Sequence, residues 1–522
     1  MSTTAPNGLS IGSIVRRAAH QYGNRTAFIF GDERCSFAEY NRRVNRAAHT
    51  LRGLGVEKGG HVAILGKNSI QYLELCHGAG KAGIVFGTIN WRLTVDEIAF
   101  IVSDADNEVL FVEAEFQPIA AQLKEKLPNL RYVVYGGPVK LDGALSYEAL
   151  TAEAGDEEPN VDIDGSDDAI IMYTSGTTGL PKGAVLTHSN VCWDLVAALT
   201  YVTPQQGDCF LLSMPMNHVS GLHTQTTTFL ARGLPIVVMS QWEPEEACRL
   251  IEKHRITLAY ILVAPLLQLL DSPLRDKYDL SSLRRLMTAA AKYTADVPMR
   301  AMTELGVESV YFMYGLTEAS PIVSTTEFTA QMLQKPNTLG FPVWYNDVRI
   351  VDEQGRQLPP GEVGEIIVRG PNVFKGYHKR PDANAETLRN GWLHTGDLGY
   401  ADEDGFLFFV DRKKDMIKTG GENVYSVEVE LAILNTYENV QEVAIVGIPD
   451  PKWGEAVTAF VVARPGTTID SEELIAKART VLGGYKLPKR VVVCDQLPKN
   501  VSGKVLKRQL REQYTNELET TA

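Results

Sequence analysis

The chain has 522 residues, an apolar fraction of 44% and a charged fraction of 22%, which are the proportions of ordinary globular proteins. This length exceeds one typical core and predicts two or more domains. The formal net charge of −13 argues against nucleic acid as a partner and against a basic, membrane-binding surface.

The cysteines indicate a reducing compartment. Six of them stand singly, at positions 35, 76, 192, 209, 248 and 494, with no C-x-x-C pair. This pattern is neither a disulfide framework nor a zinc site. The first ten residues, MSTTAPNGLS, show no secretory signal, and the richest apolar run, LAYILVAP (258–265), is far shorter than a bilayer span. We expect a cytoplasmic protein without a transmembrane segment.

The first half of the chain alternates between helical and strand patterns. Apolar residues recur every three or four positions from Phe37 to Leu51, between Ser36 and Gly53, which predicts a capped amphipathic helix. Strand-like runs follow at 61–65, 108–113 and 132–136, separated by helical segments. The alternation continues to about residue 320 and predicts layered α/β architecture with largely parallel sheets.

The texture changes after about residue 340. Paired β-runs with turn-rich sequence occupy 349–370 and 393–412, and a charge cluster, DRKKDMIKTGG, occupies 411–421. A compact α/β unit follows, with helices VEVELAIL and SEELIAKARTVL and strands VAIVGI, AFVVA and RVVV. We predict a large N-terminal α/β domain with a β-rich portion (1–411), a small mobile α/β C-terminal domain (412–522) and a hinge near 411–415.

A polar loop, YTSGTTGLPKGAV (173–185), follows the apolar strand AIIM (169–172). Small residues let backbone N–H groups converge on phosphate oxygens, and Lys182 adds a positive charge. The loop departs from the P-loop pattern G-x-x-x-x-G-K-[ST] because Lys182 precedes a glycine. Taken alone it is also compatible with a surface turn, since glycine, serine and threonine are ordinary turn residues.

Further motifs accompany this loop: MPMNHVSG (214–221), YGLTE (314–318), GEVGEIIVRG (361–370), WLHTGDLG (392–399), the segment 411–430 and PKNVSGKVLKRQL (498–510). Together with YTSGTTGLPKG they resemble, over nearly the whole chain, the signatures of the adenylate-forming superfamily. Its members include acyl-CoA synthetases, aryl-CoA ligases, luciferases and peptide-synthetase adenylation domains. The resemblance implies an ATP-dependent carboxylate–CoA ligase that forms acyl-CoA, AMP and pyrophosphate through an acyl-adenylate. ATP, Mg²⁺ and coenzyme A would be its cofactors, and a small carboxylic acid its substrate.

The resemblance also implies which residues bind ATP. Tyr314 would stack on adenine, with Ala290 and Ala291 passing under the base, while Asp397 and Arg412 would reach the ribose. The predicted ATP-binding set is Thr174, Ser175, Gly176, Thr177, Thr178, Gly179, Lys182, Ala290, Ala291, Tyr314, Thr317, Asp397, Arg412 and Lys504.

The resemblance assigns the chemistry of the first step to a lysine and a metal ion. Lys504, in VSGKVLK, would neutralise the charge that builds up during attack on the α-phosphate of ATP. Thr317 would hydrogen-bond that phosphate. Thr174 and Glu318 would hold Mg²⁺, a hard cation that needs oxygen ligands. The predicted catalytic residues are Lys504, Thr317, Glu318 and His218.

For the second step, the resemblance implies that the C-terminal domain turns about Lys414 and brings a glycine-rich turn to the acyl-adenylate. Glycines there let the backbone come close to a pantetheine arm. The predicted coenzyme A contacts are Arg92, Thr419, Gly420, Gly421, Trp453, Tyr485 and Lys489.

The predicted acyl pocket comprises His218, Val219, Ser220, Ala289 and Gly315. The residues that follow, from Ser220 to Thr226, are unusually polar, and TAAAKY (288–293) stands where many relatives have a Gly-Gly-Ala-Pro pattern. Both departures count against a long-chain fatty acid and leave short- to medium-chain, aromatic and polar acids open. Lys292 could also meet a charged substrate tail.

Four alternatives share some of these motifs. A stand-alone adenylation enzyme would load a carrier protein, and a long-chain fatty acid CoA ligase would change only the acid. A luciferase-like oxidase fits the fold alone. A non-catalytic nucleotide-binding module would not need to retain Thr174, Glu318, Asp397, Arg412 and Lys504 together. The sequence leaves a homodimer open.

Overall fold

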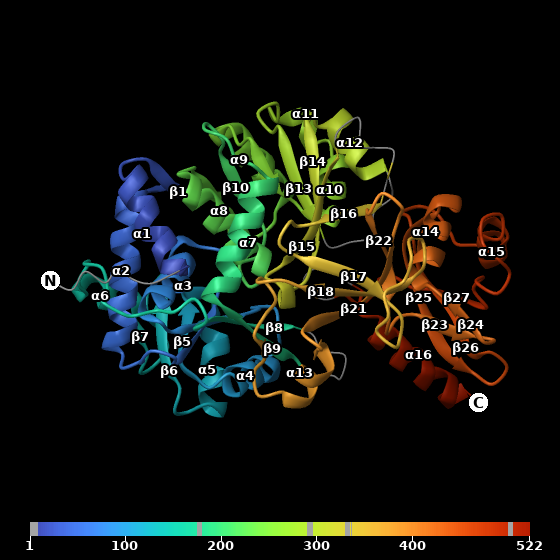
Figure 1. Cartoon of the computed structure of the whole chain (residues 1–522), viewed down its shortest axis with the longest axis horizontal. Helices are drawn as coiled ribbons and strands as arrows, with labels where there is room; N and C mark the ends of the chain where they lie inside the picture. Colours follow the sequence, from blue (N-terminus) through green and yellow to red (C-terminus); the bar gives the residue numbers. More distant parts are fainter. Residues whose placement is uncertain are drawn as a thin grey trace.

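The computed structural model describes residues 9–174, 180–289, 296–328, 335, 337–499 and 505–521. Within these ranges the chain forms three sheets flanked by helices (Figure 1). Two large sheets use strands up to Arg412, and a separate five-stranded sheet begins at Ile417. The predicted α/β fold class, with a large N-terminal part and a small C-terminal part, is confirmed.

The fourteen-stranded sheet of the described chain has the order β17 (Asp347–Val351), β18 (Gly364–Arg369), β21 (Trp392–Ala401), β22 (Leu407–Arg412), β16 (Thr338–Pro342), β15 (Ile322–Phe328), β14 (Ser309–Gly315), β13 (Arg285–Ala289), β12 (Leu258–Tyr260), β10 (Phe210–Leu212), β11 (Ile236–Val238), β1 (Thr26–Phe30) and β2 (Glu33–Ser36), with β20 (Leu388–Arg389) paired to β21. Along this order, neighbouring strands between β14 and β1 pair in parallel. Neighbouring strands between β17 and β14 pair antiparallel. The predicted β-rich portion is this antiparallel half.

The eight-stranded sheet has the order β19 (Gly376–Tyr377), β9 (Lys182–Thr187), β8 (Asp168–Thr174), β4 (Val85–Ile89), β3 (His61–Leu65), β5 (Asn107–Glu113), β6 (Arg131–Tyr135) and β7 (Leu145–Ser146). The five-stranded sheet contains β24 (Glu422–Val424), β23 (Ile417–Thr419), β26 (Gly454–Ala463), β25 (Val440–Asp450) and β27 (Arg490–Val493).

The helices are α1 (Ile11–Tyr22), α2 (Phe37–Gly53), α3 (Ile70–Ala82), α4 (Val95–Asp104), α5 (Gln117–Lys126), α6 (Tyr147–Glu153), α7 (His188–Tyr201), α8 (Gln225–Arg232), α9 (Pro244–His254), α10 (Val263–Leu270), α11 (Leu274–Lys277), α12 (Asp296–Glu304), α13 (Pro381–Thr387), α14 (Ser426–Thr436), α15 (Ser471–Ala478) and α16 (Lys507–Thr521). Two 3₁₀ turns, η1 (Ala114–Phe116) and η3 (Thr317–Ala319), and one π turn, η2 (Ser220–Thr224), complete them.

The local predictions agree closely with these bounds. The helix predicted from Phe37 is α2, and its N-terminus is capped because the Ser36 hydroxyl accepts a hydrogen bond from the Glu39 amide at 3.2 Å. The strand predicted at 61–65 is β3. The helix predicted as SEELIAKARTVL was wrong at its end, because α15 stops at Ala478 and tighter turns lead to Gly483.

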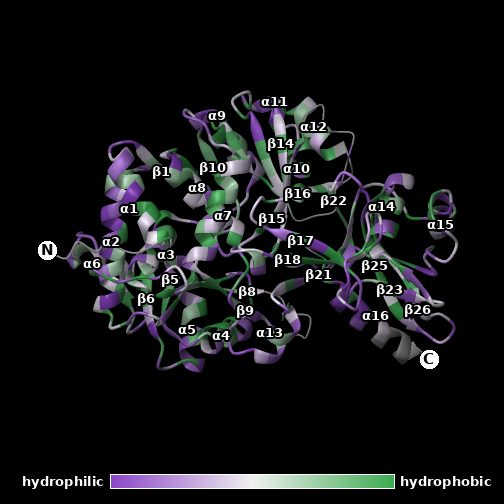
Figure 2. Ribbon diagram, in the orientation of Figure 1, coloured by the Kyte–Doolittle hydropathy of each residue, from purple (hydrophilic) through white to green (hydrophobic). Residues whose placement is uncertain are grey.

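Buried hydrophobic residues come from strands and helices alike, and Figure 2 shows hydrophobic stretches in both, interspersed with hydrophilic ones. The N-terminal part contains one extended core and a separate cluster around Ala63, Leu110 and Val134, whereas the C-terminal unit has its own core around Val429, Ile445 and Val457. Asp411 joins the two parts, since its carboxylate accepts hydrogen bonds from the Arg412 amide at 2.8 Å and from the Ser426 amide at the start of α14.

Among the described residues, no helix combines the length and the apolar character needed to cross a membrane. None of the six cysteines, all of which lie in the described ranges, forms a disulfide bond, and five of them are buried.

Candidate active site

The candidate site lies where the parallel half of the large sheet gives way to the antiparallel half. Strands β13 and β14 end there in Ala289 and Gly315, and β8 of the second sheet ends in Thr174. In α/β sheets, ligands bind beyond the carboxyl ends of such strands. Three predicted site segments therefore follow the carboxyl ends of strands: β13 at Ala289, β14 at Gly315 and β8 at Thr174.

Tyr314, Asp397 and Arg412 meet at this edge from three strands. The Tyr314 hydroxyl donates to Asp397 Oδ2 at 2.8 Å, and Arg412 Nε lies 3.3 Å from Asp397 Oδ1. The strand register makes the last contact, because Asp397 and Arg412 are cross-strand partners on β21 and β22. Burial, reinforced by the Asp397 carboxylate, raises the pKa of Tyr314 well above its ordinary value. The trio presents a buried carboxylate beside an aromatic ring and a cation.

Thr174 and Glu318 come together although 144 residues separate them. Thr174 Oγ1 donates to Glu318 Oε1 at 3.5 Å, and the Tyr377 hydroxyl donates to the same oxygen at 2.7 Å. Lys182 Nζ lies 5.4 Å from the centre of the Tyr377 ring. Tyr377 is a contact that the motifs did not reveal, because it lies in β19, outside every recognised segment.

These oxygens fit a magnesium ion. A hydroxyl and a carboxylate are hard ligands, and Mg²⁺ is usually bound by one or two protein groups together with substrate phosphates and water. The described residues contain no group of three or more His, Cys, Asp or Glu side chains that could hold a metal on its own. A metal at Thr174 and Glu318 would therefore depend on a phosphate-bearing partner.

The turn that carries Thr317 and Glu318 is tightly fixed. The Leu316 amide donates to the Pro321 carbonyl at 3.1 Å, and the Phe374 amide donates to the Glu318 carbonyl at 2.9 Å. A Cβ atom on Gly315 would collide with the Pro321 carbonyl oxygen. The backbone can make this turn only with glycine at position 315.

We expect Gly315→Ala to abolish adenylation or to prevent folding, because the collision involves backbone atoms that cannot move aside. Thermal unfolding and pyrophosphate release measure the two effects. Gly53→Ala is the matched control, since a Cβ at Gly53 meets no atom within 4 Å. Equal stability and activity of Gly315→Ala and Gly53→Ala would contradict this account of the turn.

Three of the predicted acyl residues, His218, Val219 and Ser220, lie at the start of η2, whereas Ala289 and Gly315 end β13 and β14. Burial, aided by the positive charge of Arg92, lowers the pKa of His218 to about 4, so the imidazole is neutral near pH 7. His218 Nε2 is buried without a hydrogen-bond partner among the described residues. Val219 is buried, and Ser220 begins the π turn. Such turns are frequent at functional sites.

The predicted coenzyme A residues fall into two places. Gly420 and Trp453 meet in the C-terminal unit, where the Gly420 amide donates to the Trp453 carbonyl at 2.7 Å. Lys489 Nζ lies 5.1 Å from the centre of the Trp453 ring, and Tyr485 is exposed nearby in sequence. Thr419 and Gly421 flank Gly420 in the β23–β24 turn. Arg92 instead belongs to the N-terminal part, with its guanidinium 3.9 Å from the centre of the Trp91 ring.

Lys414 lies just after β22, at the junction between the two parts. Burial lowers its pKa, and the neighbouring charges of Asp415, Arg412 and Asp397 act on it with opposite signs. Some predicted residues lie outside the described residues: Ser175, Gly176, Thr177, Thr178, Gly179, Ala290, Ala291, Lys292 and Lys504.

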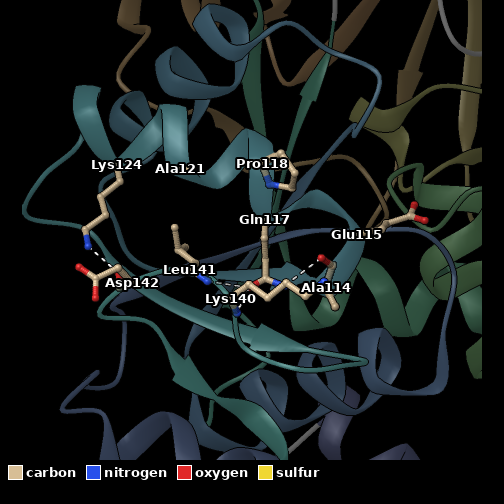
Figure 3. Close-up of a pocket in the computed structure, with 9 residues that line it drawn as sticks. All are labelled: Ala114, Glu115, Gln117, Pro118, Ala121, Lys124, Lys140, Leu141 and Asp142. Atoms are coloured by element: carbon tan, nitrogen blue, oxygen red, sulfur yellow. Dashed lines mark hydrogen bonds between the residues drawn. The ribbon is translucent and has the colours of Figure 1, made fainter.

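A pocket of about 600 Å³ lies elsewhere, between α5 and the segment 140–142 (Figure 3). Gln117 holds that segment, because its Oε1 accepts hydrogen bonds from the Lys140 amide at 2.6 Å and the Leu141 amide at 2.8 Å. Lys124 Nζ donates to the Asp142 carbonyl at 2.6 Å. These groups stabilise the segment itself and contain none of the predicted site residues.

Comparison with known proteins decides the family. The model of the AMP-binding enzyme family matches residues 15–378, and that of the AMP-binding enzyme C-terminal domain matches residues 428–504. The chain belongs to the AMP-binding enzyme family.

Relatives of known name are similar over almost the whole chain of this AMP-binding enzyme. A feruloyl-CoA synthase of Amycolatopsis sp is 38% identical over 97% of this chain and 99% of the relative. An indoleacetate–CoA ligase of Aromatoleum aromaticum is 36% identical over 94% of this chain and 95% of the relative.

Solved structures of o-succinylbenzoate CoA synthetase (MenE) from Bacillus subtilis are also similar, each at 29% identity. The complex with the acyl-adenylate intermediate OSB-AMP has a TM-score of 0.84 and covers 95% of this chain and 97% of that chain. The complex with ATP and magnesium ion has a TM-score of 0.83 and covers 95% and 98%. The predictions of an AMP-forming acid–thiol ligase, of an acyl-adenylate intermediate and of ATP, Mg²⁺ and coenzyme A as cofactors are confirmed for this AMP-binding enzyme.

Proposed function

We propose that this AMP-binding enzyme converts an aromatic or other short carboxylic acid to its coenzyme A thioester, at the edge formed by β14, η3 and β21. The observation that carries the proposal is that one short turn, from Tyr314 to Glu318, links two clusters of polar side chains that would hold the two ends of ATP. Its first residue meets Asp397, and its last meets Thr174. This arrangement would suit a nucleoside beside Asp397 and a metal-bound phosphate beside Thr174 and Glu318.

Asp397 and Arg412 would hold the ribose, since a carboxylate can accept hydrogen bonds from two neighbouring hydroxyls. Thr174 and Glu318 would hold Mg²⁺, which when bound neutralises phosphate oxygens. Thr317 would donate a hydrogen bond to the α-phosphate. His218 is neutral near pH 7 and buried, so it would line the acid-binding side without adding charge.

The small domain would act as a mobile carrier of two catalytic surfaces. We place the domain boundary within 411–415 because β22 ends at Arg412 and a new sheet and core begin at Ile417. Rotation about Lys414 would present Lys504 for adenylation and the turn at Thr419–Gly421 for thioester formation.

Coenzyme A, and not a carrier protein, is the proposed acceptor. An exposed Tyr485, and Trp453 with Lys489 5.1 Å from its ring centre, suit an adenine with phosphate groups. The absence of disulfide bonds among the cysteines of the described chain supports a cytoplasmic location.

Pyrophosphate release tests this function across a panel of carboxylic acids, with and without coenzyme A. We expect acid-dependent release in both cases and acyl-CoA only when coenzyme A is present. Release that depends on acid but never yields a thioester would overturn coenzyme A as the acceptor.

A variant at the ribose site tests the assignment of Asp397. We expect Asp397→Asn to raise the KM for ATP by roughly 10- to 100-fold, because hydrogen bonds to a charged group contribute about 1.5–3 kcal/mol each. The wild type should also discriminate against 2′-deoxy-ATP, and the variant should lose most of that discrimination. Unchanged discrimination would contradict a ribose contact, even if the variant were less stable.

A further inference from the structure

A buried carboxyl group lies beside the predicted acyl pocket and has no role in adenylation or thioester formation. Asp194, on α7, has a relative exposure of 0%. Its Oδ2 accepts a hydrogen bond from Thr224 Oγ1 at 2.7 Å, and its Oδ1 accepts one from the Ile322 amide at 3.4 Å. Within the described part of the chain it forms no ion pair. A buried charge without an ionic partner is unfavourable.

The protonation of this carboxyl follows from its surroundings. Burial raises the pKa of Asp194 to about 8, and the hydrogen bonds from Thr224 and Ile322 oppose that rise only in part. The group is therefore mostly protonated near pH 7, and a neutral carboxyl can both donate and accept hydrogen bonds.

Asp194 connects the elements that carry the predicted acyl residues. Thr224 ends the π turn that Ser220 begins, and Ile322 starts the strand that follows the turn at Gly315. Tyr260, at the end of β12, is electrostatically coupled to the same group: burial raises the pKa of Tyr260, a hydrogen bond with Ser220 opposes that rise, and the charge of Asp194 adds to it. Four polar side chains from three elements, α7, η2 and β12, thus lie beside the predicted acyl residues of η2.

Buried polar atoms without partners gather around the same elements. Both amide atoms of Gln225 lack a hydrogen-bond partner among the described residues, although the side chain is only 1% exposed. The same holds for His223 Nδ1, while His223 Nε2 lies 3.2 Å from the Ser320 carbonyl oxygen. Thr288 Oγ1, next to Ala289, is a further example. Buried polar groups normally have partners, so this concentration points to a ligand that supplies them.

We propose that Asp194, Ser220, Thr224 and Tyr260 form a polar wall that recognises an uncharged hydrogen-bonding group, such as a phenolic hydroxyl, at the far end of an aromatic carboxylic acid. This inference rests on the proposed function, because it requires the acid to bind beside His218 and Gly315. An alkyl chain would leave the unpaired polar atoms of Gln225, His223 and Thr288 beside it without partners. A carboxylate tail would lie against a carboxyl that has no cation beside it among the described residues.

Paired substrates test the polar wall. We expect the wild-type enzyme to prefer 4-hydroxycinnamate over cinnamate by about tenfold or more in kcat/KM, since sites built to hydrogen-bond a hydroxyl reject analogues that lack it. Asp194→Leu and Thr224→Val should bring this ratio close to one while the KM for ATP stays unchanged. Asp194→Asn, which keeps a neutral donor and acceptor, should retain most of the preference.

Thr227→Val is the matched control. Thr227 is buried like Thr224 and lies on α8, which directly follows η2, but its hydroxyl donates to the His223 carbonyl at 2.6 Å. It should keep the wild-type ratio. If Asp194→Leu does not fold, the preference for 4-hydroxycinnamate over cinnamate is compared between Thr224→Val and Thr227→Val, and that comparison tests the polar wall.

Two results would overturn the polar wall. One concerns the ratio of kcat/KM for 4-hydroxycinnamate to kcat/KM for cinnamate: this ratio would be near one in the wild type, or it would be the same in Asp194→Leu and Thr224→Val as in the wild type. The other is turnover of hexanoate, decanoate or 2-succinylbenzoate with no turnover of either cinnamate. Failure of every acid to give acyl-CoA would instead contradict the proposed function.

Discussion

Lys504→Ala is expected to slow acyl-adenylate formation by at least about 100-fold, the loss typical of removing one group that stabilises transition-state charge. The same variant should convert supplied acyl-adenylate and coenzyme A to acyl-CoA at close to the wild-type rate. The reason is that Lys504 would face the α-phosphate only in the first of the two arrangements of the small domain. Pyrophosphate release measures the first step, and thioester absorbance measures the second.

Lys499→Ala is the control for that prediction. Lys499 lies in the same motif, but its Nζ pairs with Glu442 Oε2 at 2.6 Å on the surface of the small domain. Its loss should leave both steps intact. If Lys504→Ala slowed both half-reactions equally, rotation of the small domain about Lys414 would be contradicted.

Glu318→Gln is expected to lower the adenylation rate by about 10- to 1000-fold and to raise the Mg²⁺ concentration needed for half-maximal rate. The amide keeps the size of the side chain and a bond to Tyr377, but it removes the negative charge that a hard cation requires. A titration of the adenylation rate with MgCl₂ separates these effects.

Glu327→Gln provides the comparison for Glu318→Gln, since Glu327 is exposed on the neighbouring strand β15. It should show the wild-type Mg²⁺ dependence. A variant Glu318→Gln with unchanged Mg²⁺ dependence would mean that the carboxylate serves only to fix the turn.

The sequence predicted the parts of the structure that depend on local pattern. The strand at 61–65 and the helix from Phe37 follow from periodicity and capping, which short segments carry by themselves. The end of α15 was missed because Arg479–Leu482 has helical composition, and the turns that end the helix became clear only from the hydrogen bonds.

The site was predictable where its residues lie in recognisable motifs, and not where tertiary packing supplies them. The meeting of Thr174 with Glu318 and of Tyr314 with Asp397 was implied by the family resemblance. Tyr377 and Asp194 gave no signal, because a tyrosine in a short strand and an aspartate in a helix are ordinary residues. Only the folded chain places one on Glu318 and buries the other with no charged partner among the residues that the structure describes.

The most direct test is a single-turnover experiment with enzyme, ATP, Mg²⁺ and 4-hydroxycinnamate, first without and then with coenzyme A. We expect up to one equivalent of acyl-adenylate per enzyme to accumulate before coenzyme A is added. It should then disappear at the rate at which acyl-CoA and AMP appear. Acyl-CoA that forms without a detectable, chemically competent acyl-adenylate, or AMP release that needs no acid, would contradict the two-step reaction at this site.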